Sequence, residues 1–104
     1  MLTSDEVIHI IYEEIQNIFD ISNLHGVDLK KCLIKPVRQR YISSRDDNIR
    51  FEFWTVLEES EDGKGYKIFY DEDENSFGLG IKGFKDELVY LGYYGTFLET
   101  LKGM

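Results

Sequence analysis

Residues 66–82 read YKIFYDEDENSFGLGIK and predict two β-strands joined by an acidic turn. The runs 66–70 and 77–82 each alternate between two faces, which is the period of a strand. Four acids at 71–74 separate the runs, and the Asn75 and Ser76 that follow are residue types common in turns. In the second run, Gly78 and Gly80 lie on the face opposite Phe77, Leu79 and Ile81.

Two further strands flank this pair. Residues 49–58 (IRFEFWTVLE) place Phe51, Phe53, Thr55 and Leu57 on one face, and Glu52, Trp54 and Val56 on the other. The dipeptide Asp62-Gly63 then signals a turn. Residues 88–93 form the last predicted strand and contain Gly92. Glycines inside strands mark bulges or the close approach of another backbone. Here they would either admit a packed helix or open a shallow concave face for a partner.

Each end of the chain predicts a helix. Apolar residues recur at helical spacing over residues 4–20, after a capping box in which Thr3 or Ser4 is the cap. A second capping box, Thr96 to Glu99, opens a short helix that Gly103 ends.

The order of elements predicts an α+β fold in one domain, residues 1–104. We expect an N-terminal helix, an antiparallel meander of four to five strands and a short C-terminal helix, with both helices on one sheet face. Pro36 disfavours a central strand, so residues 32–42 are interpreted as an edge strand. Whether the whole segment 30–50 is an edge strand or a loop stays open.

The charge is negative overall and unevenly spread. The chain carries a formal net charge of −8, which disfavours nucleic acid as a ligand of the whole surface. The charge suits either attraction of a basic partner or solubility alone. Residues 30–50 depart from this, with seven basic residues against Asp46 and Asp47, a net charge of +5. The seven are Lys30, Lys31, Lys35, Arg38, Arg40, Arg45 and Arg50.

Two acidic turns, together with an aromatic anchor, supply the predicted partner-binding residues. Because alternate turns of a meander lie at opposite ends of the sheet, we expect two separate patches, either of which could bind a basic protein. The candidate residues are Glu58, Glu59, Glu61, Asp62, Tyr70, Asp71, Glu72, Asp73 and Glu74.

Residue spacing predicts no enzyme, no cofactor and no metal. Asp71, Asp73 and Asn75 match alternate positions of a calcium-binding EF-hand loop. However, Ser76 stands where that loop needs glycine, and Lys82 where it needs a bidentate acid. The single Cys32 has apolar neighbours and is interpreted as a small buried hydrophobe, which suits a reducing compartment. With no secretory signal and no apolar run long enough to span a bilayer, we expect a cytoplasmic protein and no membrane partner.

The last third of the chain, residues 66–104, resembles small immunity proteins of contact-dependent growth inhibition and related polymorphic toxin systems. The resemblance is carried by YDEDENSFGLGI at 70–81 and LVYLGYYGTFLETLKGM at 88–104. It implies a cytoplasmic, non-enzymatic protein that binds and blocks its cognate toxin, often a basic nuclease. Under it, the Gly-Leu-Gly and Tyr-Gly-Thr-Phe residues are scaffold, and the basic segment is a departure from a purely acidic inhibitor.

The leading hypothesis is thus an immunity protein with a basic protein toxin as its partner. The alternative is a small module that binds nucleic acid or another anionic ligand through residues 30–50, with Tyr41, Phe51 and Phe53 stacking on bases. A homodimer also stays open, since an exposed sheet edge can pair across a two-fold axis.

Overall fold

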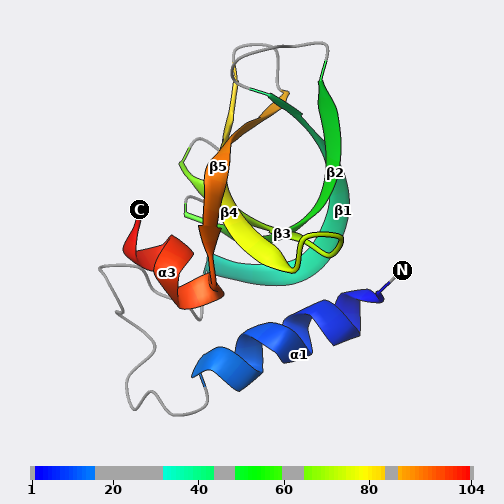
Figure 1. Ribbon diagram of the computed structural model, residues 1–104, viewed down its shortest axis with the longest axis vertical. Coiled ribbons are helices and arrows are strands. Elements are labelled where there is room, and N and C mark those ends of the chain that lie inside the picture. The colour runs from blue at the N-terminus through cyan, green and yellow to red at the C-terminus, as the bar shows by residue number, and fades with distance from the viewer. Residues whose placement is uncertain (1, 16–31, 44–48, 60–64, 84–86, 104) are drawn as a thin grey trace.

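Five strands form a closed barrel in the computed structural model, which describes residues 2–15, 32–43, 49–59, 65–83 and 87–103. Two helices pack outside the barrel (Figure 1). The elements are α1 (Ser4–Ile15), β1 (Leu33–Ser43), β2 (Arg50–Glu58), β3 (Lys67–Asp71), β4 (Ser76–Lys82), β5 (Leu88–Gly95) and α3 (Phe97–Lys102). The α+β class is therefore confirmed. No helix among the described residues is long and apolar enough to cross a membrane.

The strands pair in chain order, each antiparallel to the next, as predicted. The predicted open meander is wrong, however, because β1 also pairs with β5 and closes the ring. In a five-stranded meander the first and last strands run in the same direction, so this closing contact is parallel. It joins Tyr41–Ser43 to Leu88–Tyr90.

The edge-strand interpretation of residues 32–42 holds for only part of β1. Tyr41 and Ile42 have strand neighbours on both sides, whereas residues 33–40 pair with β2 alone among the described residues. Pro36 lies in this second part, within an irregularity of the β1–β2 register between Leu33 and Val37. Proline can occupy that place because no ladder hydrogen bond is needed from its nitrogen. The homodimer expectation depended on an exposed sheet edge. Part of that edge is paired within the chain, because β1 and β5 close the barrel.

Aromatic rings fill the inside of the barrel. Tyr41, Phe53 and Phe69 are buried there, and the Phe53 and Phe69 rings stack with centroids 4.1 Å apart. Gly78 and Gly80 face these rings: a Cβ on Gly80 would lie 2.6 Å from Cε2 of Tyr41, and one on Gly78 would overlap the Phe69 ring. The glycines therefore admit aromatic rings, where the sequence left a helix or an open concave face as the alternatives.

A second core lies between the outside of the barrel and the two helices. Val7, Ile11 and Ile15 of α1 contribute the apolar stripe predicted from the sequence. The strands contribute Trp54, Val56, Leu57, Ile68, Tyr70, Phe77 and Leu79, and α3 contributes Phe97 and Leu101. Both helices thus cover the outer face of the sheet. Leu57 was predicted on the Phe53 face and instead joins the outer core, because a bulge between Thr55 and Leu57 reverses the alternation.

Both predicted helix starts are confirmed. At α1 the Glu6 N–H donates to Thr3 Oγ1 at 3.2 Å, and the Thr3 N–H donates to Glu6 Oε1 at 3.1 Å. Ser4, the other candidate cap, instead donates its hydroxyl to the Pro36 carbonyl at 2.7 Å. At α3, Thr96 and Glu99 form the same reciprocal pair. Of the predicted helix 4–20, residues 16–20 lie outside the described residues.

Candidate functional site

The acidic turn between β3 and β4 directs its first acid inward. Asp71 is 7% exposed and accepts two hydrogen bonds, from the Tyr93 hydroxyl at 2.6 Å and from the Asp73 N–H at 3.0 Å. The second bond, from a backbone N–H two residues further on, is typical of an Asx turn and favours the reversal of the chain between β3 and β4. Tyr70, another predicted contact residue, is 3% exposed, and its hydroxyl donates to Asn75 Oδ1 at 2.7 Å. Asp71 and Tyr70 therefore hold the turn together.

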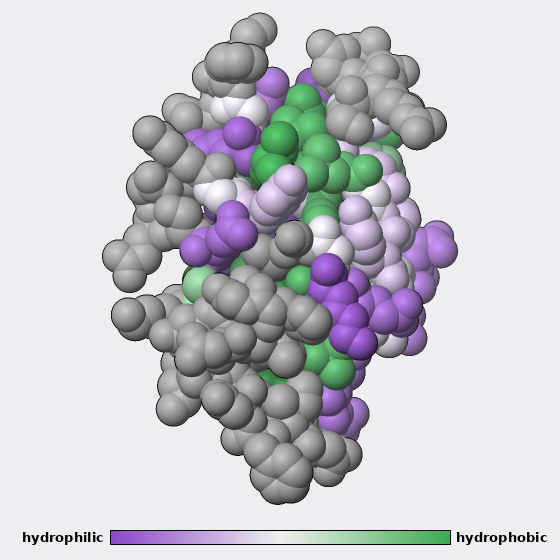
Figure 2. Space-filling view, turned by 90° about the vertical axis from the view of Figure 1, so that its left-hand side faces the viewer, coloured by the Kyte–Doolittle hydropathy of each residue, from purple (hydrophilic) through white to green (hydrophobic). Residues whose placement is uncertain are grey.

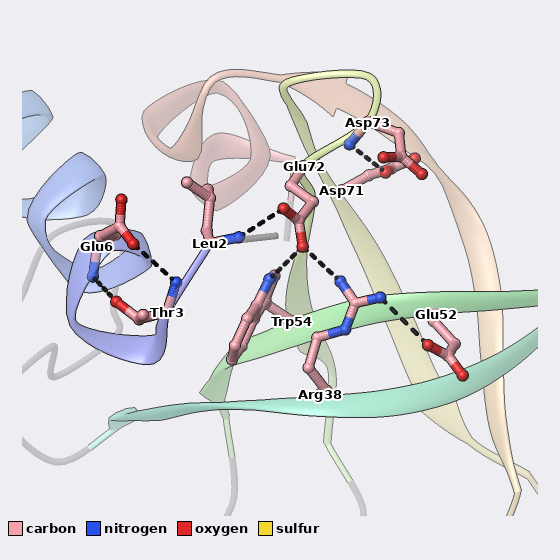
Figure 3. A network of polar contacts seen from close by, with 9 residues as sticks. All are labelled: Leu2, Thr3, Glu6, Arg38, Glu52, Trp54, Asp71, Glu72 and Asp73. Carbon is pink, nitrogen blue, oxygen red and sulfur yellow. Dashed lines mark hydrogen bonds and ion pairs between the residues drawn. The ribbon is translucent and has the colours of Figure 1, made fainter.

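Glu72 joins three parts of the chain, as Figure 3 shows. Its Oε2 accepts the Leu2 N–H at 2.8 Å, and its Oε1 accepts Trp54 Nε1–H at 3.2 Å and an Arg38 N–H at 2.9 Å. These contacts, with the Leu2 hydrogen bond as the largest cause, lower the pKa of the Glu72 carboxyl. The carboxylate therefore fixes the N-terminal segment, and with it the start of α1, against β1 and β2.

Arg38 is the basic partner in this network. Its guanidinium lies 5.4 Å from the Trp54 ring centre and also pairs with Glu52 at 3.2 Å. Arg40, two residues on, is exposed and lies opposite Glu52 in the β1–β2 register. The described part of the basic segment is thus partly balanced by acids of the same face. Lys35 and Arg50 are exposed, and Lys30, Lys31 and Arg45 lie outside the described residues.

The other acidic cluster lies at the opposite end of β3. Glu58 pairs with the ammonium of Lys67, which is 4% exposed, at 3.2 Å. Glu59 is exposed, and its Oε1 accepts the Tyr66 N–H at 3.2 Å. Glu61 and Asp62 lie outside the described residues. The structure therefore separates the two predicted clusters, and leaves Asp73, Glu74 and Glu59 as the described candidates that are exposed.

Next to the β3–β4 turn lies an acidic groove that the sequence analysis missed. It has a volume of about 480 Å³ and runs between α1, the turn and the start of α3. Its lining residues are Ile10, Glu13, Glu14, Asn75, Phe77, Gly95, Thr96 and Glu99. We call this set the acidic groove. No single stretch of sequence signals it, because its carboxylates come from two helices at opposite ends of the chain.

The carboxylates of the acidic groove differ in their roles. Glu14 accepts the Phe97 N–H with both oxygens, at 3.1 and 3.2 Å, and so caps the first turn of α3. Glu99 is exposed and completes the capping box with Thr96. Glu13 is exposed and lies 2.9 Å from Nε2 of His9. Unlike Glu14 and Glu99, Glu13 does not cap α3. It is therefore the groove carboxylate best placed to bind a cation of a partner.

The acidic surface continues along α1. A second hollow of about 470 Å³ shares Ile10 with the acidic groove and is lined also by Leu2, Asp5, Glu6 and His9. Neither hollow is lined by lysine or arginine from the described residues. Asp73 and Glu74 immediately precede Asn75 of the groove. One side of the molecule therefore gathers carboxylates from α1, the turn and α3 around an apolar floor of Ile10 and Phe77.

The turn 71–75 joins two strands, where an EF-hand loop would join two helices. Within the described ranges, no group of three or more His, Cys, Asp or Glu side chains could hold a metal ion. Cys32 is half-buried, and its Sγ donates to the Glu59 carbonyl at 3.6 Å. Comparisons of the chain with protein-family models, curated proteins and solved structures found no match.

Proposed function

We propose that this chain is a cytoplasmic, non-enzymatic immunity protein that binds a basic protein toxin and blocks its action. The observation that carries the proposal is the acidic groove with its apolar floor. A concave surface lined by Glu13, Glu14 and Glu99 suits an arginine or lysine side chain that is flanked by apolar contacts. The resemblance of residues 66–104 to immunity proteins points to the same class of partner.

Electrostatics add to this support. A net charge of −8 speeds the encounter with a basic partner, and the concentration of acids on one side directs the partner to that side. Asp71 and Glu72 are held by internal hydrogen bonds, so the acids offered to the toxin are Glu13, Asp73, Glu74 and Glu99. The proposal thus keeps the binding class expected from the sequence and moves its centre from the turn to the groove beside it.

The proposal predicts that a reading frame next to that of this chain encodes a toxin domain, and the direct test expresses that domain. Cells expressing that domain alone should stop growing, and cells that also express this chain should grow. Glu13→Lys should weaken protection, because it places a cation among the groove carboxylates. Growth arrest that this chain does not relieve, at comparable expression of a folded protein, would refute the proposal.

The nucleic-acid alternative receives less support from the structure. Arg38 is held by Glu52 and Glu72, and Phe53 is buried inside the barrel and cannot stack on a base. A gel shift with single-stranded RNA at low salt would separate the two functions, since the immunity proposal predicts no shift.

A further inference from the structure

Gly92 differs from the other glycines of the strands. Cβ atoms on Gly78 and Gly80 would overlap aromatic rings, whereas a Cβ on Gly92 would have no heavy atom of the described residues within 4 Å. Gly95 is the one glycine with a positive φ among the described residues, so the backbone at Gly92 is open to any L-residue. Glycine weakens a strand, and none of the described residues requires it at this half-buried position, so a role in contacting another chain is the explanation that we pursue.

Two bulges place apolar side chains on either side of Gly92. The β4–β5 register skips Leu91, between Tyr90 and Gly92, and again skips Tyr94, between Tyr93 and Gly95. Bulges re-aim side chains, and these two residues are 40% and 43% exposed. The outer face of β5 therefore presents Leu91, Gly92 and Tyr94 as a strip with a low centre.

The strip has a fixed aromatic end and an apolar border. A Cβ on Gly103 would lie 2.5 Å from Cε2 of Tyr94, so the Tyr94 ring packs against the end of α3. At the other end, half-buried Ile81 and Val89 are paired neighbours on β4 and β5. Figure 2, which faces this side of the molecule, shows apolar atoms gathered over its upper part. Tyrosine is among the residues enriched in binding hot spots.

The strip leads into the acidic groove. Gly95 and Thr96, which directly follow Tyr94, line the groove together with Glu99. Gly95 lies three residues after Gly92 along the strand, which is roughly 10 Å. One segment of a partner can therefore contact the apolar strip and the groove carboxylates at the same time.

We propose that an extended segment of the basic toxin lies across the outer face of β5, with its closest approach at Gly92. One of its apolar side chains packs between Leu91 and Tyr94, and a neighbouring arginine or lysine enters the acidic groove. This inference rests on the proposed function, and it specifies which strand and which kind of segment form the contact. The carboxylates of the acidic groove favour a basic side chain of the toxin. The absence of a side chain at Gly92 allows the toxin backbone to come close to β5.

The test measures affinity and folding on the same variants. The toxin domain identified by the growth test is purified and titrated calorimetrically into the wild type, Gly92→Ala, Gly92→Val and Leu91→Ala. Val37→Ala is the matched control, because Val37 is an aliphatic residue on β1 with an exposure of 45%, close to the 40% of Leu91. Gly92→Val should weaken binding about tenfold or more, and Leu91→Ala should weaken it severalfold. Both should keep the wild-type melting temperature, and Val37→Ala should bind as the wild type does.

The outcomes separate the two proposals. If the wild type binds and both Gly92 variants bind equally well, the β5 contact is refuted and the proposed function stands. If the wild type does not bind, both are refuted. If Gly92→Val lowers the melting temperature, the smaller Gly92→Ala decides: weaker binding at an unchanged melting temperature supports the contact, and unchanged binding overturns it.

Discussion

The ring of Phe69 occupies the space that a side chain at position 78 would need. Phe69 and Gly78 are register partners on β3 and β4, and a Cβ on Gly78 would overlap ring atoms Cζ and Cε2 of Phe69 as well as the Gly92 carbonyl oxygen. Because Phe69 in turn stacks on Phe53, this glycine decides whether the barrel can close around its aromatic core.

Because Gly78 contacts the Phe69 ring, adding a single methyl group at position 78 should greatly lower the stability of the fold. Gly78→Ala should lower the free energy of unfolding by about 3 kcal/mol, since the added methyl overpacks a core that cannot expand. Chemical denaturation measures this directly. The control is Gly92→Ala on the adjacent strand, which should be as stable as the wild type or slightly more so. A Gly78→Ala protein of wild-type stability would contradict the described packing of Phe69.

Glu72 predicts an acid-sensitive attachment of the N-terminal segment. Its carboxyl has a lowered pKa, so the stability it contributes is present above the ordinary pKa of about 4.3 and is lost as the pH falls through the lowered value. Glu72→Gln should cost about 2 kcal/mol at neutral pH and should flatten the acid limb of the stability curve.

The matched control for that experiment is Glu74→Gln, which changes an exposed acid of the same turn. Denaturation series at neutral and acidic pH compare the two variants with the wild type. Equal acid dependence in Glu72→Gln and the wild type would show that Glu72 does not hold the segment.

Glu14 predicts a link between the two helices. Because it caps the Phe97 N–H from the opposite end of the chain, Glu14→Ala should destabilise the fold by about 1 kcal/mol. Hydrogen exchange should show faster exchange of the Phe97 amide. Glu13→Ala, at an exposed neighbouring position, should change neither quantity, and an unaltered Phe97 exchange rate in Glu14→Ala would count against the cap.

Tyr93 and Tyr41 predict a loss of stability in alkali. Burial raises the pKa of both phenols, and at Tyr93 the hydrogen bond to Asp71 raises it further. The unfolded chain therefore releases these protons first, and stability should fall as the pH rises above about 10. Tyr93→Phe should lose about 1 kcal/mol at neutral pH and show a shallower alkaline decline. Phenolate absorbance during the titration checks the order, and a Tyr93 that ionises like a free tyrosine would contradict it.

Sequence periodicity predicted the elements well because their causes are local. The Thr96–Glu99 box, the stripe of Val7 and Ile11, and the alternation around Gly78 all depend on residues a few positions apart. Closure of the barrel depends on Tyr41 meeting Leu88, and the bulge at Val56 depends on packing between strands. Neither has a local signature in the sequence.

The candidate site divides in the same way. The sequence identified the acids of the β3–β4 turn, but charge alone did not show that Asp71 and Glu72 bind internal partners more than 20 residues distant. The acidic groove joins Glu13 to Glu99, a pairing that only the packing of α1 against α3 produces. The sequence also could not predict the open space at Gly92, since all three glycines lie within predicted strands and only the structure distinguishes Gly92 from Gly78 and Gly80.

The central claim is that this chain acts by binding a basic protein through its acidic side. Its most direct test is the association rate with the toxin domain identified by the growth test, measured by stopped flow over a series of salt concentrations. We predict fast association that slows at least about tenfold as salt screens the charges, and a smaller salt effect in Glu13→Gln/Glu74→Gln. No association at low salt, or a rate that salt and these substitutions leave unchanged, would contradict the account.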